Sequence, residues 1–239
     1  RAEFVYDNSI SLLQNIRVGT RFKTFYEYQK LLTQNQDYTN IIGADFRFHN
    51  RIHRLITFNN RIAIGQSFGS SNIAFTLGGL DGWIGARRDG GVERSENYNF
   101  QQEAYVTHLR GYNQNVRNGN KYAVYNSEIR VPIIRYLNLP WYREFWQKLQ
   151  FVGFGDLGTA WVGPSPFSDE NPFSTDIYHT EGNPVKVTAN YEIDPILKSI
   201  GWGVRSKIFG YYFKAERSYP HHNGRFYDSI WQVSTVLDF

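Results

Sequence analysis

Residues 16–29 of the chain read IRVGTRFKTFYEYQ, and apolar and polar side chains alternate along this stretch. The even positions carry Ile, Val, Thr, Phe and Tyr, whereas the odd positions are mostly Arg, Lys, Glu and Gln. Successive side chains of a strand point to opposite faces, so this period of two predicts a β-strand with one apolar and one charged face. The stretch is more than twice as long as an ordinary strand of about five or six residues.

The same alternation recurs in both halves of the chain. Asp45, Arg47, Glu128, Arg130 and Arg205 all fall on the polar side of their segments, opposite Ile, Val, Phe and Trp. We expect a tight turn near Asn50 and nine strands, near residues 1–7, 16–30, 38–49, 52–67, 121–132, 148–162, 200–208, 210–217 and 228–239. A soluble sandwich or a lipocalin-like barrel would alternate in the same way, so the period alone leaves these folds open.

Strand length and aromatic placement favour a transmembrane β-barrel over the soluble folds. A strand that crosses a bilayer at a tilt needs about 9 to 11 residues, and the aromatic residues crowd the strand ends as an interfacial girdle would. Such a barrel faces lipid outside and has a polar lumen. In the final segment, Trp231, Val233, Thr235, Leu237 and Phe239 share one face, which we expect to be the lipid face, with Gln232, Ser234 and Asp238 inside.

Composition excludes several other classes of protein. No stretch of the 239 residues has the roughly 18 to 20 apolar residues of a membrane-spanning helix. The chain has no Cys, which removes thiol chemistry and disulfides, and its net charge of +4 is scattered, which argues against nucleic-acid binding. Because the chain opens on Arg1 without Met or an apolar signal segment, we expect a mature or truncated piece of something longer.

Two apparent catalytic patterns have simpler interpretations. Residues 153–158 match the dinucleotide-binding pattern G-x-G-x-x-G, but they lie within a strand pattern and no helix can begin in the Pro-containing stretch that follows. The six histidines lack metal-ligand spacing. The inward carboxylates, which could suggest a glycosidase-like pair, are matched by arginines on the same side, so we expect an ion-paired lumen, no enzyme activity, no cofactor and no metal.

Two long connections, near residues 69–120 and 163–199, contrast with a very short one at Phe209-Gly210. Loops of that length in a compact domain are usually functional. The first contains Leu109-Arg110-Gly111-Tyr112. It is followed by residues 126–132 (NSEIRVP), by Phe154, Asp156 and Gly158 in residues 153–161 (GFGDLGTAW), by residues 201–205 (GWGVR), and by the C-terminal Leu237-Asp238-Phe239.

In this order the segments resemble the C-terminal half of the barrel in the BamA/TpsB superfamily of outer-membrane proteins, also known as bacterial surface antigens. The resemblance covers roughly residues 61–239, with Leu109 in place of the usual Val of the V-R-G-F/Y motif. Residues 2–8 and 77–83 are similar to a Bacteroidota branch of this superfamily, in which such barrels can follow a periplasmic region.

The length of 239 residues predicts a single domain. The resemblance implies that its strands are the last nine or so of a sixteen-stranded barrel with long extracellular loops. It implies that Arg110 folds back into the lumen and pairs with Asp156, near the inner-wall residues Phe154, Gly158, Glu128, Arg130 and Arg205. Leu237 and Phe239 would act as the terminal insertion signal.

The function implied by the resemblance is insertion or translocation of polypeptides across the bacterial outer membrane. Substrate strands would add at a seam between weakly paired first and last strands. The expected partners are outer-membrane lipid and polypeptide substrates or partner outer-membrane and periplasmic proteins, and not nucleic acid. The alternative is a passive or plugged pore that serves as a scaffold for a surface or periplasmic partner, in which no seam opens.

Overall fold

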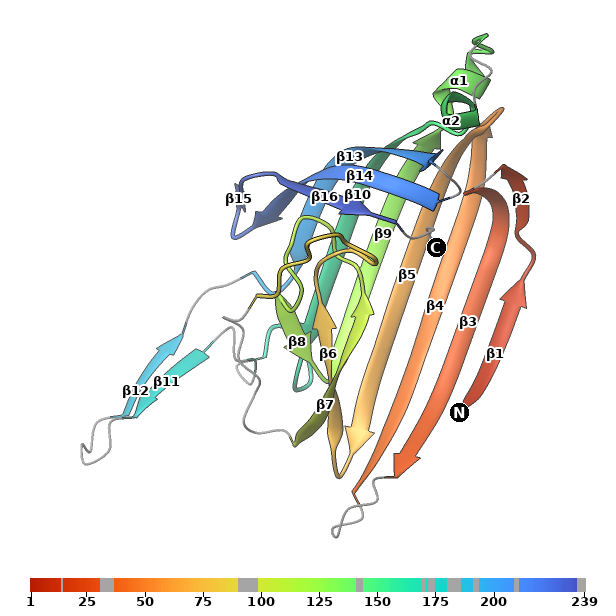
Figure 1. Cartoon of the computed structure of the whole chain (residues 1–239). Coiled ribbons are helices and arrows are strands. Elements are labelled where there is room, and N and C mark those ends of the chain that lie inside the picture. The colour runs from red at the N-terminus through yellow and green to blue at the C-terminus, as the bar shows by residue number, and fades with distance from the viewer. Residues whose placement is uncertain are drawn as a thin grey trace.

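The computed structural model describes residues 1–13, 15–30, 37–89, 99–140, 144–168, 171, 175–179, 186–190, 194–208 and 211–235. A single antiparallel sheet dominates it, and we call this sheet the wall (Figure 1). The strands of the wall are β1 (Ala2–Asp7), β2 (Ile10–Leu13), β3 (Ile16–Lys30), β4 (Tyr38–His53), β5 (Ile56–Gly69), β9 (Lys121–Val131), β10 (Gln150–Trp161), β13 (Leu197–Ile208), β14 (Tyr211–His222), β15 (Arg225–Phe226) and β16 (Ile230–Ser234).

The order of strands across the wall is the order along the chain. Both β1 and β2 pair with β3 at one edge, and both β15 and β16 pair with β14 at the other. The eleven strands therefore occupy nine positions across the sheet, which agrees with the nine strands expected from sequence. In the described part of the chain the two edges do not pair with each other, so the wall remains open.

Burial along β5, β9, β10, β14 and β16 follows the predicted period of two. In β9 the buried residues are the even ones, including Asn126, Glu128 and Arg130, whereas Ile129 on the opposite face is 44% exposed. In the last strand Gln232 and Ser234 are fully buried while Trp231 and Val233 are exposed, as the sequence predicted. The inner face of the wall therefore holds its buried charged side chains, and the outer face holds exposed apolar ones.

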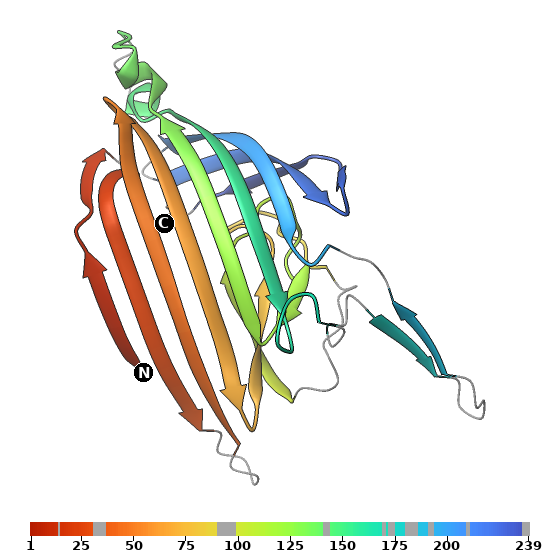
Figure 2. The same cartoon turned by 180° about the vertical axis from the view of Figure 1, so that it is seen from behind.

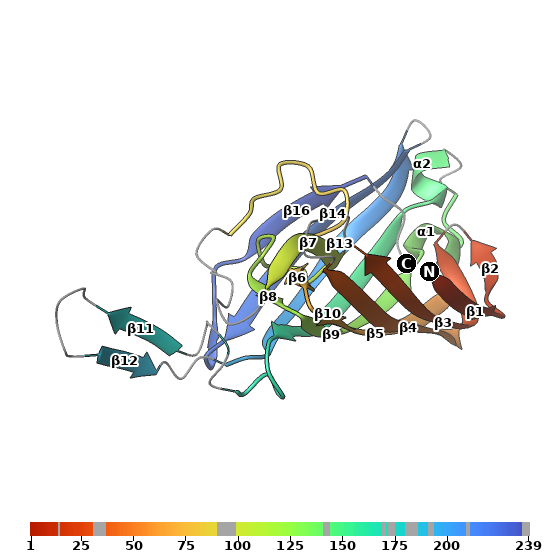
Figure 3. The same ribbon diagram turned by 90° about the horizontal axis from the view of Figure 1, so that it is seen from below.

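The segment between β5 and β9 folds back over the inner face of the wall. It forms a small sheet of β6 (Asn72–Leu77), β7 (Phe100–Thr107) and β8 (Arg117–Gly119), in which β6 pairs parallel to β7 and antiparallel to β8. Seen from below in Figure 3, the wall curves around this small sheet. Seen from behind in Figure 2, the outer face of the long strands is uncovered.

The contact between the small sheet and the wall is an apolar core. Ile73, Phe75 and Leu77 of β6 pack against side chains that the wall strands send inward, namely Ile41, Ala63, Tyr122, Val124 and Ala160. All six residues of β6 are buried, and the face that carries Ile73, Phe75 and Leu77 is the one that meets the wall. The connection expected as a loop thus has strands of its own.

Several boundaries differ from those expected. The predicted turn near Asn50 is wrong: β4 continues to His53, and the turn lies at residues 54–55, where Arg54 takes a left-handed φ of 45°. The predicted strand at 228–239 corresponds to β16, which covers Ile230–Ser234 of the described residues and begins two residues later than expected. Residues 236–239 and the predicted turn at Phe209-Gly210 lie outside the described residues.

Two helices and a hairpin were also not expected from the sequence. Two short helices, α1 (Ile133–Tyr136) and α2 (Glu144–Gln147), connect β9 to β10 at the end of the wall where β4 turns into β5 (Figure 1). A hairpin of β11 (Thr175–His179) and β12 (Lys186–Asn190) projects from the long connection between β10 and β13. Within the described residues, no helix is long and apolar enough to cross a membrane.

Candidate functional site

The candidate site is the place where residues 109–112, which we call the anchor segment, cross the inner face of β9, β10, β13 and β14. Leu109 is fully buried and Arg110 is only 1% exposed. Gly111 has a φ of 84°, a left-handed conformation that glycine adopts without the steric cost of a Cβ. This tight turn directs Arg110 toward the wall.

Arg110 forms a two-pronged ion pair with Asp156 of β10, as the resemblance implied. Its Nε lies 2.6 Å from Oδ2 of Asp156, and its Nη2 lies 2.6 Å from Oδ1. The backbone N–H of Arg110 also donates to Oδ2, at 3.3 Å, and Asn126 donates to Oδ1, at 2.9 Å. The planar guanidinium matches the carboxylate in a way that the ammonium group of lysine cannot.

Phe154 places its ring against the same guanidinium. The Cζ of Arg110 lies 3.7 Å from the centroid of the Phe154 ring, within the range of a cation–π contact. Phe154, Asp156 and Gly158 share the inner face of β10 because they are two residues apart. Gly158 leaves room for Leu109, because a Cβ at position 158 would lie only 3.0 Å from Cδ1 of Leu109. The sequence F-x-D-x-G therefore fits residues 109 and 110 together.

Glu128 of β9 connects Arg110 to two further arginines. It accepts from Nη1 of Arg110 at 2.5 Å, from Nε of Arg130 at 2.9 Å and from Nη2 of Arg205 at 3.0 Å. Arg205 also contacts Glu216 of β14 with its Nε, at 3.0 Å. All six side chains of this cluster are 1% exposed or less, and its three arginines balance its three carboxylates. Buried charges are tolerated when they are paired in this way.

We call this group the ion cluster: Arg110, Glu128, Arg130, Asp156, Arg205 and Glu216. Five of the six were singled out from the sequence as the loop arginine and its inner-wall partners. The period of two placed Glu216 only among the inward carboxylates, because it fixes the face of a side chain but not its partner. Every site residue in the described part of the chain is thus brought to one region, whereas Leu237 and Phe239 lie outside the described residues.

Gln232 of β16 is a site residue that sequence reasoning missed. Its Oε1 accepts from the backbone N–H of Gly111, at 2.9 Å. The period of two placed Gln232 on the inner face but gave no partner for it. This bond links the anchor segment to the last described strand of the wall.

Tyr112 completes the anchor segment. Its hydroxyl donates to the backbone carbonyl of Lys198, at 2.7 Å, and also lies 3.2 Å from the carbonyl of His221. Burial raises the pKa of Tyr112 to about 12, so the hydroxyl keeps its proton and remains a donor. The anchor segment is thus bonded to five wall strands, β9, β10, β13, β14 and β16.

This arrangement holds residues 109–112 against the wall and has, among its described residues, no group placed for catalysis of a reaction. Both oxygens of Asp156 and both oxygens of Glu128 accept bonds from arginines, so neither carboxylate is poised as a proton acceptor. Within the described residues, no group of three or more His, Cys, Asp or Glu side chains could hold a metal ion. No protein-family model matches this chain, and no curated protein matches it either.

Proposed function

We propose that this chain is part of an outer-membrane β-barrel that inserts or translocates other polypeptides. In this proposal the wall supplies nine strand positions of a larger barrel, other strands complete it, and the ion cluster holds the segment between β5 and β9 inside the lumen. The observation that carries the proposal is the contrast between the two faces of the wall. Charged side chains are buried and paired on the inner face, while large apolar side chains are exposed on the outer face.

The outer face is apolar over most of its width. Its exposed side chains come from strands at both ends of the wall and from the middle: Phe4, Ile42, Phe48, Ile62, Ile64, Ile129, Phe151, Leu157, Ile200, Trp202, Trp231 and Val233. A patch that spans so many strands is far larger than the surface of a soluble monomer tolerates, and a lipid environment accounts for it.

Two polar side chains on the outer face, Asn60 and Arg217, have local partners. The Asn60 side chain, which breaks the apolar pattern of β5, accepts from the Tyr125 hydroxyl at 2.7 Å. Arg217 lies 5.7 Å from the ring centroid of Trp231, and its Nε donates to Ser229. These pairings lower the cost of placing a polar group toward lipid.

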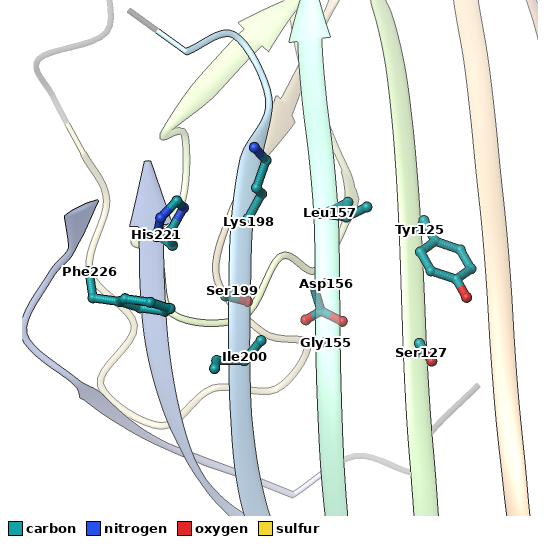
Figure 4. A pocket seen from close by; sticks show the side chains of 10 residues that line it. All are labelled: Tyr125, Ser127, Gly155, Asp156, Leu157, Lys198, Ser199, Ile200, His221 and Phe226. Atoms are coloured by element: carbon teal, nitrogen blue, oxygen red, sulfur yellow. The ribbon is translucent and has the colours of Figure 1, made fainter. Parts of the chain in front are cut away.

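The outer face also has a shallow depression around Gly155. Figure 4 shows how Tyr125, Ser127, Leu157 and Ile200 surround it, with Lys198 toward one end. The open space is about 390 Å³. A Cβ added at Gly155 would meet its first neighbour only at 3.8 Å, so the glycine leaves the surface hollow without being required by packing. An apolar hollow on this face is compatible with a lipid chain.

Strand β16 supplies the proposed seam. An edge strand presents unpaired backbone groups, and a substrate strand can add to such an edge by main-chain hydrogen bonds. In the proposal β16 and the first strand of the complete barrel pair weakly at the seam, which leaves part of the β16 edge free of that strand, and a substrate strand adds there.

Val233→Arg tests the membrane part of the proposal. This residue lies on the outer face and is 39% exposed. An arginine facing lipid costs roughly 2 to 4 kcal/mol near the midplane, so less of the variant should fold into phospholipid vesicles. Phe167→Arg is the matched control, because Phe167 is 69% exposed in the segment that follows β10 and lies off the wall. Equal insertion of the two variants would contradict a lipid-facing wall.

Client folding tests the insertion part. The complete protein is reconstituted in phospholipid vesicles, and the folding of a second, urea-unfolded outer-membrane barrel is followed by its resistance to protease. We expect faster client folding than in empty vesicles. A correctly inserted protein that leaves the client rate unchanged would refute insertion and favour the plugged scaffold, in which the clamped loop fills the lumen.

A further inference from the structure

The outer edge of β16 is not bare, because two residues of the segment between β5 and β9 reach it. Trp83 forms an isolated antiparallel bridge with Ser234, and the backbone N–H of Ile84 donates to the carbonyl of Val233, at 2.8 Å. Ser234 and Val233 already pair with Lys214 and Ala215 of β14 on their other side. Trp83 and Ile84, which we call the edge cap, therefore occupy the side of β16 that faces away from β14.

The edge cap continues the two-faced pattern of the wall. Ser234 is fully buried on the inner face, and Trp83 opposite it is partly buried. Val233 is exposed on the outer face, and Ile84 beside it is 58% exposed. Trp83 thus lies on the inner face and Ile84 on the outer face, as successive residues of a further strand would. They contact β16 as a short strand would.

The position of the edge cap is set through the anchor segment. The N–H of Gly79 donates to the carbonyl of Tyr112, at 2.9 Å. On the far side of the cap, the N–H of Gln114 donates to the carbonyl of Arg87, at 2.9 Å. Both ends of residues 79–87 are therefore hydrogen-bonded to residues 112–114, and the edge cap lies in the loop between these ends.

Glycines on both sides of the edge cap give the chain room to turn. Gly82 has a φ of 64° and Gly85 has a φ of 75°, both in the left-handed region. Nothing lies within 4 Å of the place that a Cβ of Gly85 would take. The edge cap therefore lies between two left-handed glycines, and packing around Gly85 does not hold it in position.

We propose that the edge cap is a resident occupant of the β16 edge, which must leave before another strand can pair along Ile230–Ser234. As regulation of strand addition this rests on the proposed function, whereas occupancy of the edge does not. A strand that pairs along the whole of β16 makes more backbone hydrogen bonds than a two-residue cap. A longer strand can therefore displace the cap once it has begun to pair.

Disulfide trapping tests whether the cap occupies the edge. The chain has no Cys, so Trp83→Cys combined with Ser234→Cys introduces a single pair of thiols. Residues directly opposite in antiparallel strands have Cβ atoms about 4.5 to 5.5 Å apart, and modest movement brings these within disulfide reach. We expect rapid cross-linking in the folded protein under mild oxidation. The matched pair Ala86→Cys with Ser234→Cys, three residues beyond the bridge, should cross-link slowly, and equal yields would overturn the proposal.

Peptide capture tests whether the cap competes with a strand. The probe is a nine-residue peptide of alternating Val and Thr with one central cysteine, offered to the Ser234→Cys protein under the same mild oxidation, which supplies the oxidant for the mixed disulfide. Adding Ile84→Pro removes the N–H that bonds Val233, whereas Ile84→Val keeps it. The mixed disulfide should form about tenfold faster with Pro than with Val, the factor that corresponds to one backbone hydrogen bond. Equal rates in the two variants would show that the edge cap does not compete with an added strand for β16.

The two disulfide readouts separate this inference from the proposed function. If disulfide trapping and peptide capture give the expected results but client folding is never accelerated, occupancy of the β16 edge is supported and the insertion function is refuted. If client folding is accelerated to the same extent whether the Trp83→Cys, Ser234→Cys pair is oxidised or reduced, insertion stands and the cap is overturned as a regulator.

Discussion

The anchor segment and the edge cap belong to the same excursion of the chain, yet different forces hold them. Residues 109–112 are buried and bonded through charged side chains to the wall. Trp83 and Ile84 meet β16 through one bridge and one backbone hydrogen bond, and Ile84 remains exposed. Because local stability follows burial and contact density, the first region should open only with the whole wall and the second should open alone.

The largest expected effect comes from Arg110→Ala. Removing this side chain leaves Asp156 and part of Glu128 as buried carboxylates without their partner, a loss of about 3 to 5 kcal/mol. Urea unfolding in detergent or vesicles, followed by tryptophan fluorescence, would measure it. Arg88→Ala is the control in the same excursion, because Arg88 pairs with Glu103 but is 55% exposed, and such surface pairs contribute about 0 to 1 kcal/mol.

Combining Arg110→Ala with Asp156→Asn sharpens the same test. Each single change strands the other partner, but the double variant removes both, so its loss should be smaller than the sum of the two. Additive losses would mean that the two residues stabilise the wall independently. In that case the ion cluster would not be the reason that the anchor segment resists opening.

A smaller effect is expected from Gly158→Val, compared with Gly153→Val on the same strand. A Cβ at Gly158 would lie 3.0 Å from Leu109 and 3.3 Å from Val124, whereas nothing lies within 4 Å of one at Gly153. Crowding a packed site costs about 1 to 3 kcal/mol, so Gly158→Val should lower stability while Gly153→Val leaves it nearly unchanged. If the order is reversed, the anchor segment is not packed against β10 as described.

Much of the wall is readable from the sequence because a period of two leaves little choice. Once residues 16–30 are a strand, the faces of Arg21 and Phe22 are fixed, and the same rule placed Gln232 and Ser234 inside. Arg110 and Asp156 were matched through resemblance, since 46 positions separate them and alternation gives only the face of Asp156.

The parts that escaped sequence reasoning depend on contacts between distant segments. Residues 72–77 do alternate, with Ile73, Phe75 and Leu77 on one face, but the run is only six residues long and lies within a connection of about fifty residues that was expected to be a loop. The bridge of Trp83 to Ser234 spans most of the chain and uses backbone groups, which every residue has. Arg54 took the turn that the polar Asn50 was expected to make, because side-chain polarity does not fix φ.

The smallest expected effect compares two glycines with nearly the same backbone conformation, Gly111 in the anchor segment and Gly85 beside the edge cap. Their φ values are 84° and 75°, and alanine in the left-handed region costs about 1 to 2 kcal/mol at either position. At Gly111 a Cβ would also lie 3.1 Å from Cβ of Ser218, and the segment cannot move without breaking the Arg110 bonds. Gly111→Ala should therefore lower the free energy of unfolding by that full amount.

At Gly85 the backbone strain of an alanine can be relieved without unfolding the wall. The edge cap can leave β16 and relax the backbone, so Gly85→Ala should change global unfolding by less than about 0.5 kcal/mol, as is usual for substitutions away from packed features. The strain should instead appear as faster hydrogen exchange at the Ile84 amide, whose bond to Val233 opens locally. A drop in global stability equal to that of Gly111→Ala, with Ile84 exchange unchanged, would mean that the cap is as firmly held as the anchor segment. A cap held that firmly could not leave the edge of β16 independently of the wall.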